Sequence, residues 1–303
     1  MKIAITGGTG FIGRHIINQL AAEGHQLRCW YRNPAGRFAP VRGSVEWIAG
    51  ELSAADTMKE LVAGCDAVVH SALWKPGDRF RGGEGHLPDF IQRNVGGTIQ
   101  LVEAAIQAEC PRFVYLSSCA VHEIILDDRP LDETHPLWAT SHYGAHKAAV
   151  EQFVHSYGKG QGYNICAVRP TGVYGLATPA PASKWFELVE AVTAGKEVTV
   201  SGGGKEVHVA DVAGAVSLLL GCEPEKISGE AFNCYDRYVS RYEVASLARQ
   251  LSGSDSIVHG QPRRPRHEIC TDKIRELGMT FGGETRLRET IGQLVQAVQE
   301  TAE

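Results

Sequence analysis

The chain has 303 residues, of which 43% are hydrophobic and 21% charged, and its formal net charge is -5 at pH 7. These values are typical of a folded globular protein and exclude a basic nucleic-acid-binding surface and, since no apolar run approaches ~18 residues, a membrane-spanning helix. The eight cysteines include no pair at the CxxC spacing of zinc or redox sites. We therefore expect a cytoplasmic protein with free thiols, no metal site, and no nucleic-acid or membrane partner.

Short apolar runs alternate with helical patterns as far as Arg169, which is typical of βαβ units and a parallel sheet. The runs are Ile3–Thr6, Leu27–Tyr31, Val45–Ile48, Ala67–His70, Phe113–Leu116 and Ile165–Val168. Helical spacing is clearest in two series, Ile12, Ile16, Ile17 and Leu20, and Ile91, Val95, Ile99, Val102 and Ile106. The first half is therefore predicted to be an α/β domain with a doubly wound parallel sheet of the Rossmann type.

The alternation ends after Pro170, where prolines and a glycine-rich loop at 201–204 interrupt the pattern. The later elements are predicted at 185–192 (helix), 197–200 (strand), 211–220 (helix), 231–234 (strand), 240–251 (helix) and from about 287 (helix). We expect residues 1–169 to form a dinucleotide-binding domain. Residues 170–303 are expected to form a smaller C-terminal α/β substrate-binding lobe, with some segments, about 207–234, returning to the first domain.

A glycine-rich turn follows the first predicted strand directly. It reads Thr6-Gly7-Gly8-Thr9-Gly10-Phe11-Ile12-Gly13. Glycines permit a tight turn and let backbone amides approach a pyrophosphate, whose charge then lies at the positive end of the helix dipole. An ordinary strand-to-helix turn is the alternative, but the position in a βαβ unit favours a dinucleotide site.

Further motifs follow in the order found in one family. They are Gly50-Glu51-Leu52, Asp66–Ala72, Asn94–Thr98, Val114–Ser118, Tyr143-x-x-x-Lys147, Arg169–Gly175 and Val207–Val212. With the glycine-rich turn, they resemble the extended short-chain dehydrogenase/reductase family, also called the NAD-dependent epimerase/dehydratase family. The resemblance covers about residues 1–290. It implies a Rossmann fold and an oxidoreductase that moves a hydride between a nicotinamide cofactor and a hydroxyl or carbonyl of a small molecule, such as a sugar, ketone or aldehyde.

The resemblance also implies which residues line the cofactor. They are Gly7, Thr9, Gly10, Phe11, Ile12, Gly13, Arg32, Glu51, Leu52, Ser71, Ala72, Leu73, Lys75, Asn94, Tyr143, Lys147 and Pro170. Glu51 matches an acid that meets the adenine amino group, and a surface glutamate is its alternative. Lys75 is equally well explained as a solvated charge. Asn94 is expected to bind local backbone or water as structural support, with a role in a proton relay as a further possibility and a solvent-facing helix residue as the alternative.

The end of the second predicted strand indicates which dinucleotide binds. Rossmann units that prefer NAD place an acid there, whereas this chain has Tyr31 followed by Arg32. A guanidinium suits a 2′-phosphate because its planar fork gives two charge-assisted hydrogen bonds. We predict that NADP is preferred and that NAD remains possible. The alternative is that Arg32 is a solvated loop residue.

Of the nine tyrosines, only Tyr143 has a lysine four residues later. Residues i and i+4 share a helical face with Cβ atoms about 6 Å apart, so that Lys147 can approach both the phenol and a cofactor ribose. Tyr143 is predicted to move a proton while the cofactor moves a hydride. The resemblance adds Ser118 as the hydroxyl that orients the substrate oxygen, with Ser117 as the alternative.

The residues after Ser118 argue against dehydration, because Cys119 and Ala120 stand where a dehydratase of the family carries an acidic pair. A dehydrogenase or reductase that exchanges NADP is favoured by Arg32. The alternatives are a nucleotide-sugar epimerase that retains NAD and, less expected, a dinucleotide sensor without activity. The turn at 264–267, Arg-Pro-Arg-His, departs from an Arg-Pro-Gly-Asp-like turn of nucleotide-sugar enzymes.

Three histidines and two helices complete the expectations. His122 replaces an aromatic tyrosine of the family pattern and is a candidate for lining the substrate cavity. His142 and His146 are four residues apart, and we expect them to point away from Tyr143 and to bind no zinc. The predicted helices 89–108 and 141–157 resemble the family's dimer-forming pair and carry apolar residues on more than one face, which predicts a homodimer.

Overall fold

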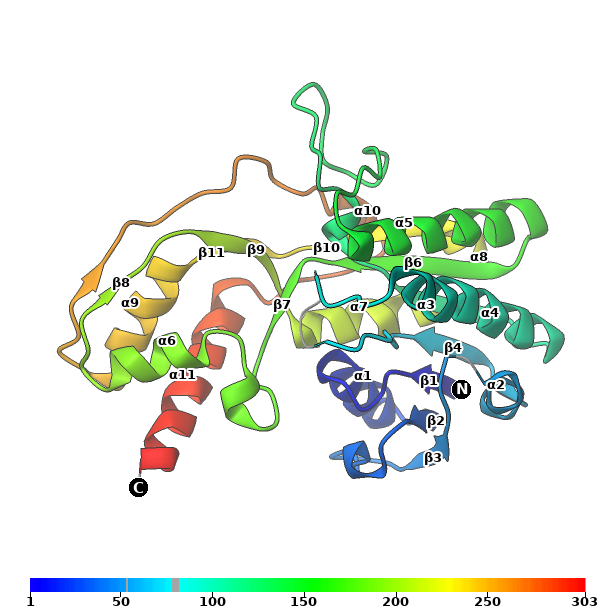
Figure 1. The fold of residues 1–303 in the computed structure, drawn as a ribbon, viewed down its shortest axis with the longest axis horizontal. Coiled ribbons are helices and arrows are strands. Elements are labelled where there is room, and N and C mark those ends of the chain that lie inside the picture. The colour runs from blue at the N-terminus through cyan, green and yellow to red at the C-terminus, as the bar shows by residue number, and fades with distance from the viewer. Residues whose placement is uncertain (53, 78–81, 303) are drawn as a thin grey trace. The chain divides into compact units, whose positions relative to one another are not determined.

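The computed structural model describes residues 1–52, 54–77 and 82–302, and it divides into two compact units (Figure 1). Unit 1 comprises Met1–Pro170, Val212–Cys234 and Ile269–Met279. Unit 2 comprises Thr171–Asp211, Tyr235–Glu268 and the chain from Thr280 onward. Among the described residues, no helix has the length and apolar character needed to cross a membrane.

Unit 1 is built on a seven-stranded parallel sheet with the order β10-β6-β5-β4-β1-β2-β3. The strands are β1 (Lys2–Thr6), β2 (Gln26–Tyr31), β3 (Val45–Ala49), β4 (Ala67–His70), β5 (Arg112–Leu116), β6 (Asn164–Pro170) and β10 (Glu230–Cys234). The central strands are apolar because helices cover both of their faces. The strand order reverses between β1 and β4, and ligands of such sheets bind at the carboxyl ends of the strands at this point.

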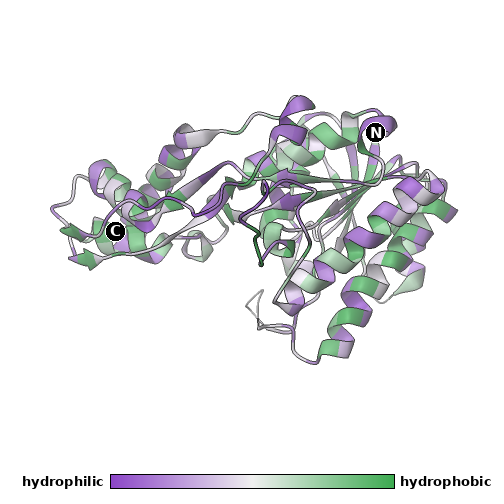
Figure 2. Ribbon diagram, turned by 90° about the horizontal axis from the view of Figure 1, so that it is seen from above, coloured by the Kyte–Doolittle hydropathy of each residue, from purple (hydrophilic) through white to green (hydrophobic). Residues whose placement is uncertain are grey.

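Helices cover both faces of this sheet. The longer ones are α1 (Phe11–Ala22), α2 (Ala55–Val62), α4 (Gly97–Gln107), α5 (His142–His155) and α7 (Val209–Gly221). The short ones are α3 (Leu87–Ile91), α8 (Pro224–Ile227) and α10 (Asp272–Glu276). On one face, α7 lies beside α1, where Ser217 donates to Glu23 at 2.7 Å. Figure 2 shows hydrophobic and hydrophilic residues alternating along the helices, as expected for helices with one face on a sheet.

The helical segment that begins with α3 and ends with α4 contains a π-helical turn at Gln92–Gly96. The additional residue in this turn changes which side chains face the sheet. The buried ones include Asn94, Thr98, Leu101, Val102 and Ala105. Of the predicted apolar series, only Val102 is buried, while the others are half-buried or, at Ile91, 37% exposed. Val95 and Ile106 are half-buried and pack against the same core as Val102, so the predicted apolar series keeps a partly buried face.

Unit 2 has a three-stranded sheet with the order β11-β9-β7 and a two-stranded sheet of β12 and β8. The strands are β7 (Gly172–Tyr174), β8 (Val198–Thr199), β9 (Gly203–His208), β11 (Arg237–Ser240) and β12 (Val258–His259). Three helices, α6 (Phe186–Thr193), α9 (Arg241–Ser252) and α11 (Gly283–Ala302), enclose a core that includes Val189, Val244 and Leu287.

The glycine-rich loop predicted at 201–204 is partly strand. Gly203 and Gly204 begin β9 and pair with Ser240 and Val239 of β11. A Cβ atom on Gly203 would lie 2.5 Å from the Val239 carbonyl oxygen. These glycines therefore allow β9 and β11 to approach closely. The sequence predicted a loop here because glycine-rich runs are typical of loops.

The chain returns to unit 1 twice. Val212–Cys234 contributes most of α7, all of α8 and the edge strand β10. This segment begins five residues after the start of the range 207–234. The second returning segment, Ile269–Met279, carries α10, which has only five residues and was not predicted because so short a helix shows no apolar period.

Candidate active site

The glycine-rich turn joins β1 to α1 through backbone that only glycine fits. Gly7 has a φ of +74°, and a Cβ atom there would lie 2.6 Å from the Ala72 backbone nitrogen. Gly10 donates from its amide to the Gly7 carbonyl at 3.0 Å and is the N-cap of α1. A Cβ atom on Gly13 would lie 2.1 Å from that same carbonyl. The turn is thus a close-packed cradle at a helix N-terminus, and it fits a dinucleotide pyrophosphate.

Arg14 fastens this turn to the loop after β2. Its Nε donates to the Thr9 carbonyl at 3.3 Å, and its Nη2 donates to the Gly36 carbonyl at 3.0 Å. Phe11 and Ile12 are half-buried in the first turn of α1. The sequence analysis missed Arg14. The sequence indicates this residue only by its position, four residues after Gly10.

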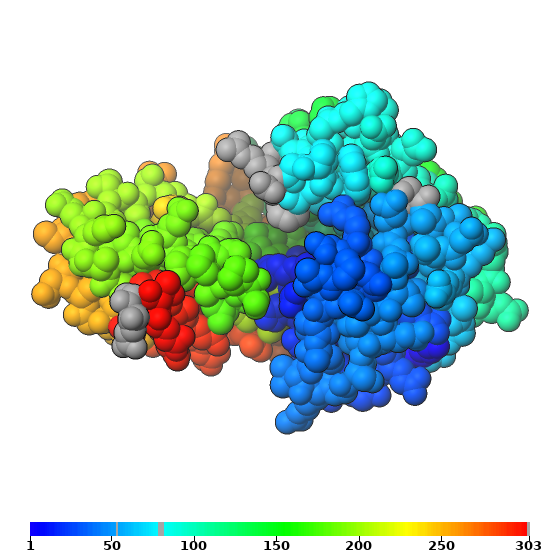
Figure 3. Space-filling model, turned by 60° about the horizontal axis from the view of Figure 1, so that its bottom comes forward, coloured from blue at the N-terminus to red at the C-terminus, as the bar shows by residue number. Residues whose placement is uncertain are grey.

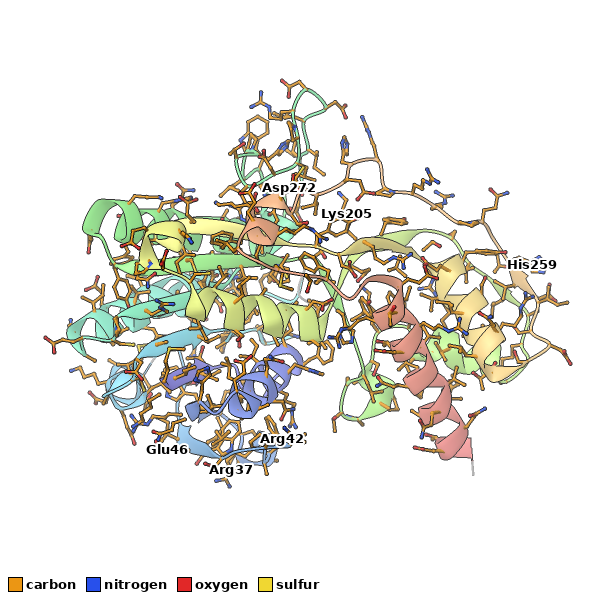
Figure 4. The ribbon with its side chains drawn as sticks, turned by 180° about the vertical axis from the view of Figure 1, so that it is seen from behind. Arg37, Arg42, Glu46, Lys205, His259 and Asp272 are labelled. Carbon is orange, nitrogen blue, oxygen red and sulfur yellow. The ribbon has the colours of Figure 1, made fainter. Side chains whose placement is uncertain are left out.

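Two arginines, Arg32 and Arg37, lie at the carboxyl end of β2. The Arg37 guanidinium lies 4.8 Å from the centre of the Tyr31 ring, and Arg32 is exposed directly after Tyr31. Figure 4 shows Arg37, Arg42 and Glu46 along the same edge of unit 1. Glu46 is paired with Arg28 at 2.8 Å. This edge therefore offers arginines to an anionic group.

Several other predicted cofactor residues have local partners. Glu51 is half-exposed, with its Oε2 atom 3.6 Å from Arg93 Nη1, and Lys75 donates to the Gly77 carbonyl at 2.8 Å. Leu52 is buried, whereas Leu73 is half-buried. Pro170 is buried at the end of β6. These contacts are compatible with either of the readings given for Glu51 and Lys75.

The segment after β4 lies against the glycine-rich turn. Ser71 donates from its hydroxyl to the Thr6 carbonyl at 2.7 Å. Asn94, in the π-helical turn, accepts from the Trp74 amide at 2.8 Å and donates to the Trp74 carbonyl at 2.9 Å. In Figure 3, residues of the first βαβ unit (blue) and residues after β4 (cyan) adjoin on one face. Asn94 therefore binds backbone, and it holds the segment that the resemblance places along the cofactor.

The helix α5 presents Tyr143 and Lys147 one turn apart. Lys147 is buried, and its Nζ donates to the Leu116 carbonyl at 2.7 Å and lies 4.6 Å from the centre of the Tyr115 ring. Burial lowers the pKa of Lys147 to about 7, and Glu151 acts against this shift. Tyr143 is half-buried. The ammonium is thus fixed at the end of β5, two residues before Ser118.

The start of α5 is tied to the loop that follows Ser118. Ser141 caps the helix by accepting from the Gly144 amide at 3.0 Å. The Glu123 carboxylate accepts hydrogen bonds from the amides and hydroxyls of Thr140 and Ser141. Partial burial acts to raise the pKa of Glu123, but these hydrogen bonds outweigh it, so that the pKa is lowered. Glu123 thus fixes the entry to the helix that carries Tyr143.

Ser118 and Tyr143 lie on elements in direct contact. Ser118 begins the 3₁₀ turn Cys119–Val121 and accepts from the Ala120 amide at 3.1 Å. A Cβ atom on Gly144 would lie 2.3 Å from the Ala120 carbonyl oxygen, so this turn packs on the first turn of α5. Ser118 is half-buried, whereas Ser117 is buried and donates to Glu151. This geometry favours Ser118 over Ser117 as the hydroxyl that can meet a substrate.

A buried ion pair contacts Ser117, the residue before Ser118. Arg169 and Glu151 are each 1% exposed, and Arg169 Nε lies 3.0 Å from both Glu151 carboxylate oxygens. His122 was a candidate for lining the substrate cavity, but it is buried, with Nε2 3.1 Å from Arg169 Nη1 and Nδ1 3.2 Å from the Pro136 carbonyl. Burial, aided by Arg169, lowers the pKa of His122 to about 4. The sequence analysis missed Glu151, although it stands four residues after Lys147.

The expectation for His146 was wrong in part. Its ring lies 5.3 Å from the Tyr143 ring and 4.9 Å from the Phe90 ring, so it packs on the tyrosine instead of pointing away, whereas His142 is exposed. Burial lowers the pKa of His146 to about 3. Within the part of the chain that the structure describes, no cluster of His, Cys, Asp and Glu is suited to a metal ion.

Comparisons with known proteins identify the family of the chain. The model of the NAD dependent epimerase/dehydratase family matches residues 3–234. The 3 beta-hydroxysteroid dehydrogenase/Delta 5-->4-isomerase of Mycobacterium tuberculosis is 30% identical over 197 residues, covering 62% of this chain and 51% of the relative. The 4-hydroxy-2-methyl-3-oxo-4-farnesyl-3,4-dihydroquinoline-1-oxide ketoreductase of Stigmatella aurantiaca is 31% identical over 220 residues, covering 70% of this chain and 62% of the relative. The chain thus spans about half to three fifths of these relatives' lengths.

The fold is also that of solved structures. The crystal structure of UDP-glucose 4-epimerase with UDP-glucose from Thermotoga maritima superposes with a TM-score of 0.81 over 100% of both chains. The sequence identity is 21%, so this similarity concerns the fold.

Proposed function

The chain belongs to the NAD dependent epimerase/dehydratase family, and on this premise we propose that it is an NADP-preferring dehydrogenase or reductase acting on a hydroxyl or carbonyl group of a small molecule. One observation carries the proposal. The turn that begins at Ser118 packs on the first turn of α5, which brings the elements of Ser118, Tyr143 and Lys147 together at the carboxyl end of β5. The bound dinucleotide supplies or accepts the hydride.

The three side chains divide the work on the substrate oxygen. Ser118 donates a hydrogen bond to that oxygen, and Tyr143 gives it a proton during reduction or takes one during oxidation. The ammonium of Lys147 favours the phenolate form of Tyr143, since an opposite charge nearby stabilises an anion. Glu123 and the Gly144–Ala120 contact fix the geometry in which these groups meet.

The arginines at the end of β2 support NADP as the preferred cofactor. Arg32 is exposed where an NAD-binding unit has an acid, and Arg37 lies over Tyr31. A 2′-phosphate would gain charge-assisted hydrogen bonds there. Titration of the protein with NADPH and with NADH tests this preference, which fails if NADH binds as tightly or more tightly.

The residues after Ser118 support simple oxidation or reduction over dehydration. Cys119 donates to the Arg169 carbonyl at 2.9 Å, and Ala120 has no polar side chain. Neither side chain is a carboxyl group, which a dehydratase of the family carries at these positions. The ketoreductase relative, 31% identical over 70% of this chain, supports a carbonyl compound as substrate, although a sugar remains within the proposal.

An epimerase is the second candidate function. It would return the hydride to the opposite face of the same substrate and keep its cofactor. Spectra of the purified protein with carbonyl compounds and alcohols separate the two candidates. A dehydrogenase or reductase changes the absorbance of added reduced or oxidised NADP, whereas an epimerase leaves it unchanged and interconverts two sugars. No change with either class would support a dinucleotide sensor.

A homodimer in the cytoplasm completes the proposal. Ile91 of α3 and Phe153 of α5 are 37% and 40% exposed, so that both helices present apolar side chains to solvent. Packing of these helices on a second copy would bury them. None of the eight cysteines forms a disulfide bond, as is usual in a reducing compartment. A monomeric mass by light scattering at micromolar concentration would refute the dimer.

A further inference from the structure

Three buried polar side chains of unit 1 form a hydrogen-bonded series that begins at the residue before the glycine-rich turn. Thr6 ends β1, His70 ends β4, and Thr98 lies in α4, and none of the three is more than 2% exposed. His70 Nδ1 lies 2.6 Å from Thr6 Oγ1, and His70 Nε2 lies 2.8 Å from Thr98 Oγ1. The imidazole therefore bridges two hydroxyl groups that belong to different layers of the fold.

The other hydrogen bonds of the two hydroxyl groups show which nitrogen of the His70 imidazole carries the proton. Thr98 donates to the Asn94 carbonyl at 2.5 Å, so it must accept from Nε2–H of His70. Nδ1 is then the acceptor for the Thr6 hydroxyl, which in turn accepts from the Ala72 amide at 3.3 Å. Every donor in this series has an acceptor when the histidine is neutral. Burial, which lowers the pKa of His70 to about 3, keeps it so.

The residues at the two ends of this hydrogen-bonded series bind the two ends of the segment 71–74. At one end, Thr6 binds the Ala72 amide and directly precedes the glycine-rich turn. At the other end, Asn94 binds both the amide and the carbonyl of Trp74. Residues 71–74 are thus fixed relative to β1 on one side and to the π-helical turn on the other.

We propose that His70 is a positioning residue that sets the distance between the glycine-rich turn and residues 71–74, acting through Thr6 and through Thr98 with Asn94. The inference rests on the proposed function, which requires a bound dinucleotide, and on the family resemblance, which places both segments along that dinucleotide. An apolar side chain of similar size would fill the space but leave both hydroxyls without their bridge. A histidine with its proton on Nε2 satisfies the donor on one side and the acceptor on the other.

Substitution of Thr98 by Val tests the proposal, and unit 2 offers a matched control. Thr290 is also 2% exposed and donates to the carbonyl of Arg286, four residues earlier, at 2.9 Å. Both Thr98→Val and Thr290→Val remove a buried helical hydroxyl and keep its shape. We expect the first to raise the Kd for NADPH about tenfold, whereas the second leaves this Kd unchanged while lowering the urea midpoint.

Nitrogen-15 NMR of the imidazole supplies a readout that a loss of stability alone would not move. In the wild type, His70 should show protonation at Nε2 only, without titration between about pH 5 and 8. In Thr98→Val both tautomers should appear. Equal Kd values for the two variants, or a wild-type imidazole protonated at Nδ1, would overturn the inference while the proposed function stands. A wild type that binds neither NADPH nor NADH would overturn the proposed function itself.

Discussion

The two ends of the candidate site are built in opposite ways. At the end of β5, Lys147 and Glu151 are buried and bound to the Leu116 carbonyl and to Arg169. At the end of β2, Arg32 is exposed. A buried charge is costly unless it is paired, whereas an exposed charge is screened by water and salt. We therefore expect the proposed catalytic end to be fixed by the fold, and the proposed cofactor-selecting end to tolerate substitution with little effect on stability.

The catalytic end should be the more sensitive to substitution, and Tyr143→Phe tests this most severely. The change removes one oxygen and keeps the ring that packs on His146. We expect turnover to fall by about 10² to 10⁴, with the Kd for NADPH nearly unchanged. Steady-state rates and a cofactor titration measure both. Retention of more than about a tenth of the rate would show that another group transfers the proton.

The buried ion pair should dominate stability at the same end. Glu151→Gln leaves the Arg169 guanidinium buried without its counter-ion, which should cost about 3–5 kcal/mol of unfolding free energy. Glu243→Gln in unit 2 is the control, because its pair with Arg237 is more than a quarter exposed and should contribute less than about 1 kcal/mol. Urea denaturation compares the two. Equal losses would remove the contrast between buried and exposed charge.

Burial of Lys147 should make stability depend on pH. The folded protein releases this proton near pH 7, whereas the unfolded chain holds it up to about pH 10.5. Unfolding in this window takes up a proton, so the free energy of unfolding should rise from pH 7 towards 10.5. Lys147→Met should lack this contribution, and Lys59→Met, at an exposed position, should keep it. Parallel profiles for the wild type and Lys147→Met would contradict the burial of a titrating ammonium.

The cofactor-selecting end should show the smallest effect and no loss of stability. Arg32→Ala should lower the preference for NADPH over NADH about tenfold and leave the urea midpoint unchanged. Arg249→Ala, which removes an exposed charge from α9, is the control for net charge. An unchanged ratio of the two dissociation constants in Arg32→Ala would show that Arg32 is a solvated loop residue.

Local patterns predicted the first half of the chain well. The fold class and the family are confirmed, because the glycine-rich turn and the apolar strands are visible within a few residues of sequence. The bridge from His70 to Thr98 and the pair of Glu151 with Arg169 join different elements of the fold. Their partners are set by strand order and helix packing, so no local spacing could reveal them.

Two further features have the same origin. The π-helical turn at Gln92–Gly96 interrupts a segment for which the sequence indicated one uniform helical spacing. His122 is bound to Arg169 because β5 and β6 are neighbours in the sheet, and its place at the substrate cavity stays a prediction. The assignments of Arg32 and of Ser118, Tyr143 and Lys147 remain predictions, which the substitutions above address.

Transfer of deuterium from the cofactor tests the central claim most directly. NADPH with deuterium at both C4 positions of the nicotinamide is incubated with the wild type and with the first carbonyl compound of a panel that is consumed, and the product alcohol is examined by mass spectrometry. Our account predicts one deuterium on the carbinol carbon with the wild type and almost no product with Tyr143→Phe. A product without deuterium, or a panel in which no compound is consumed although NADPH binds, would contradict it.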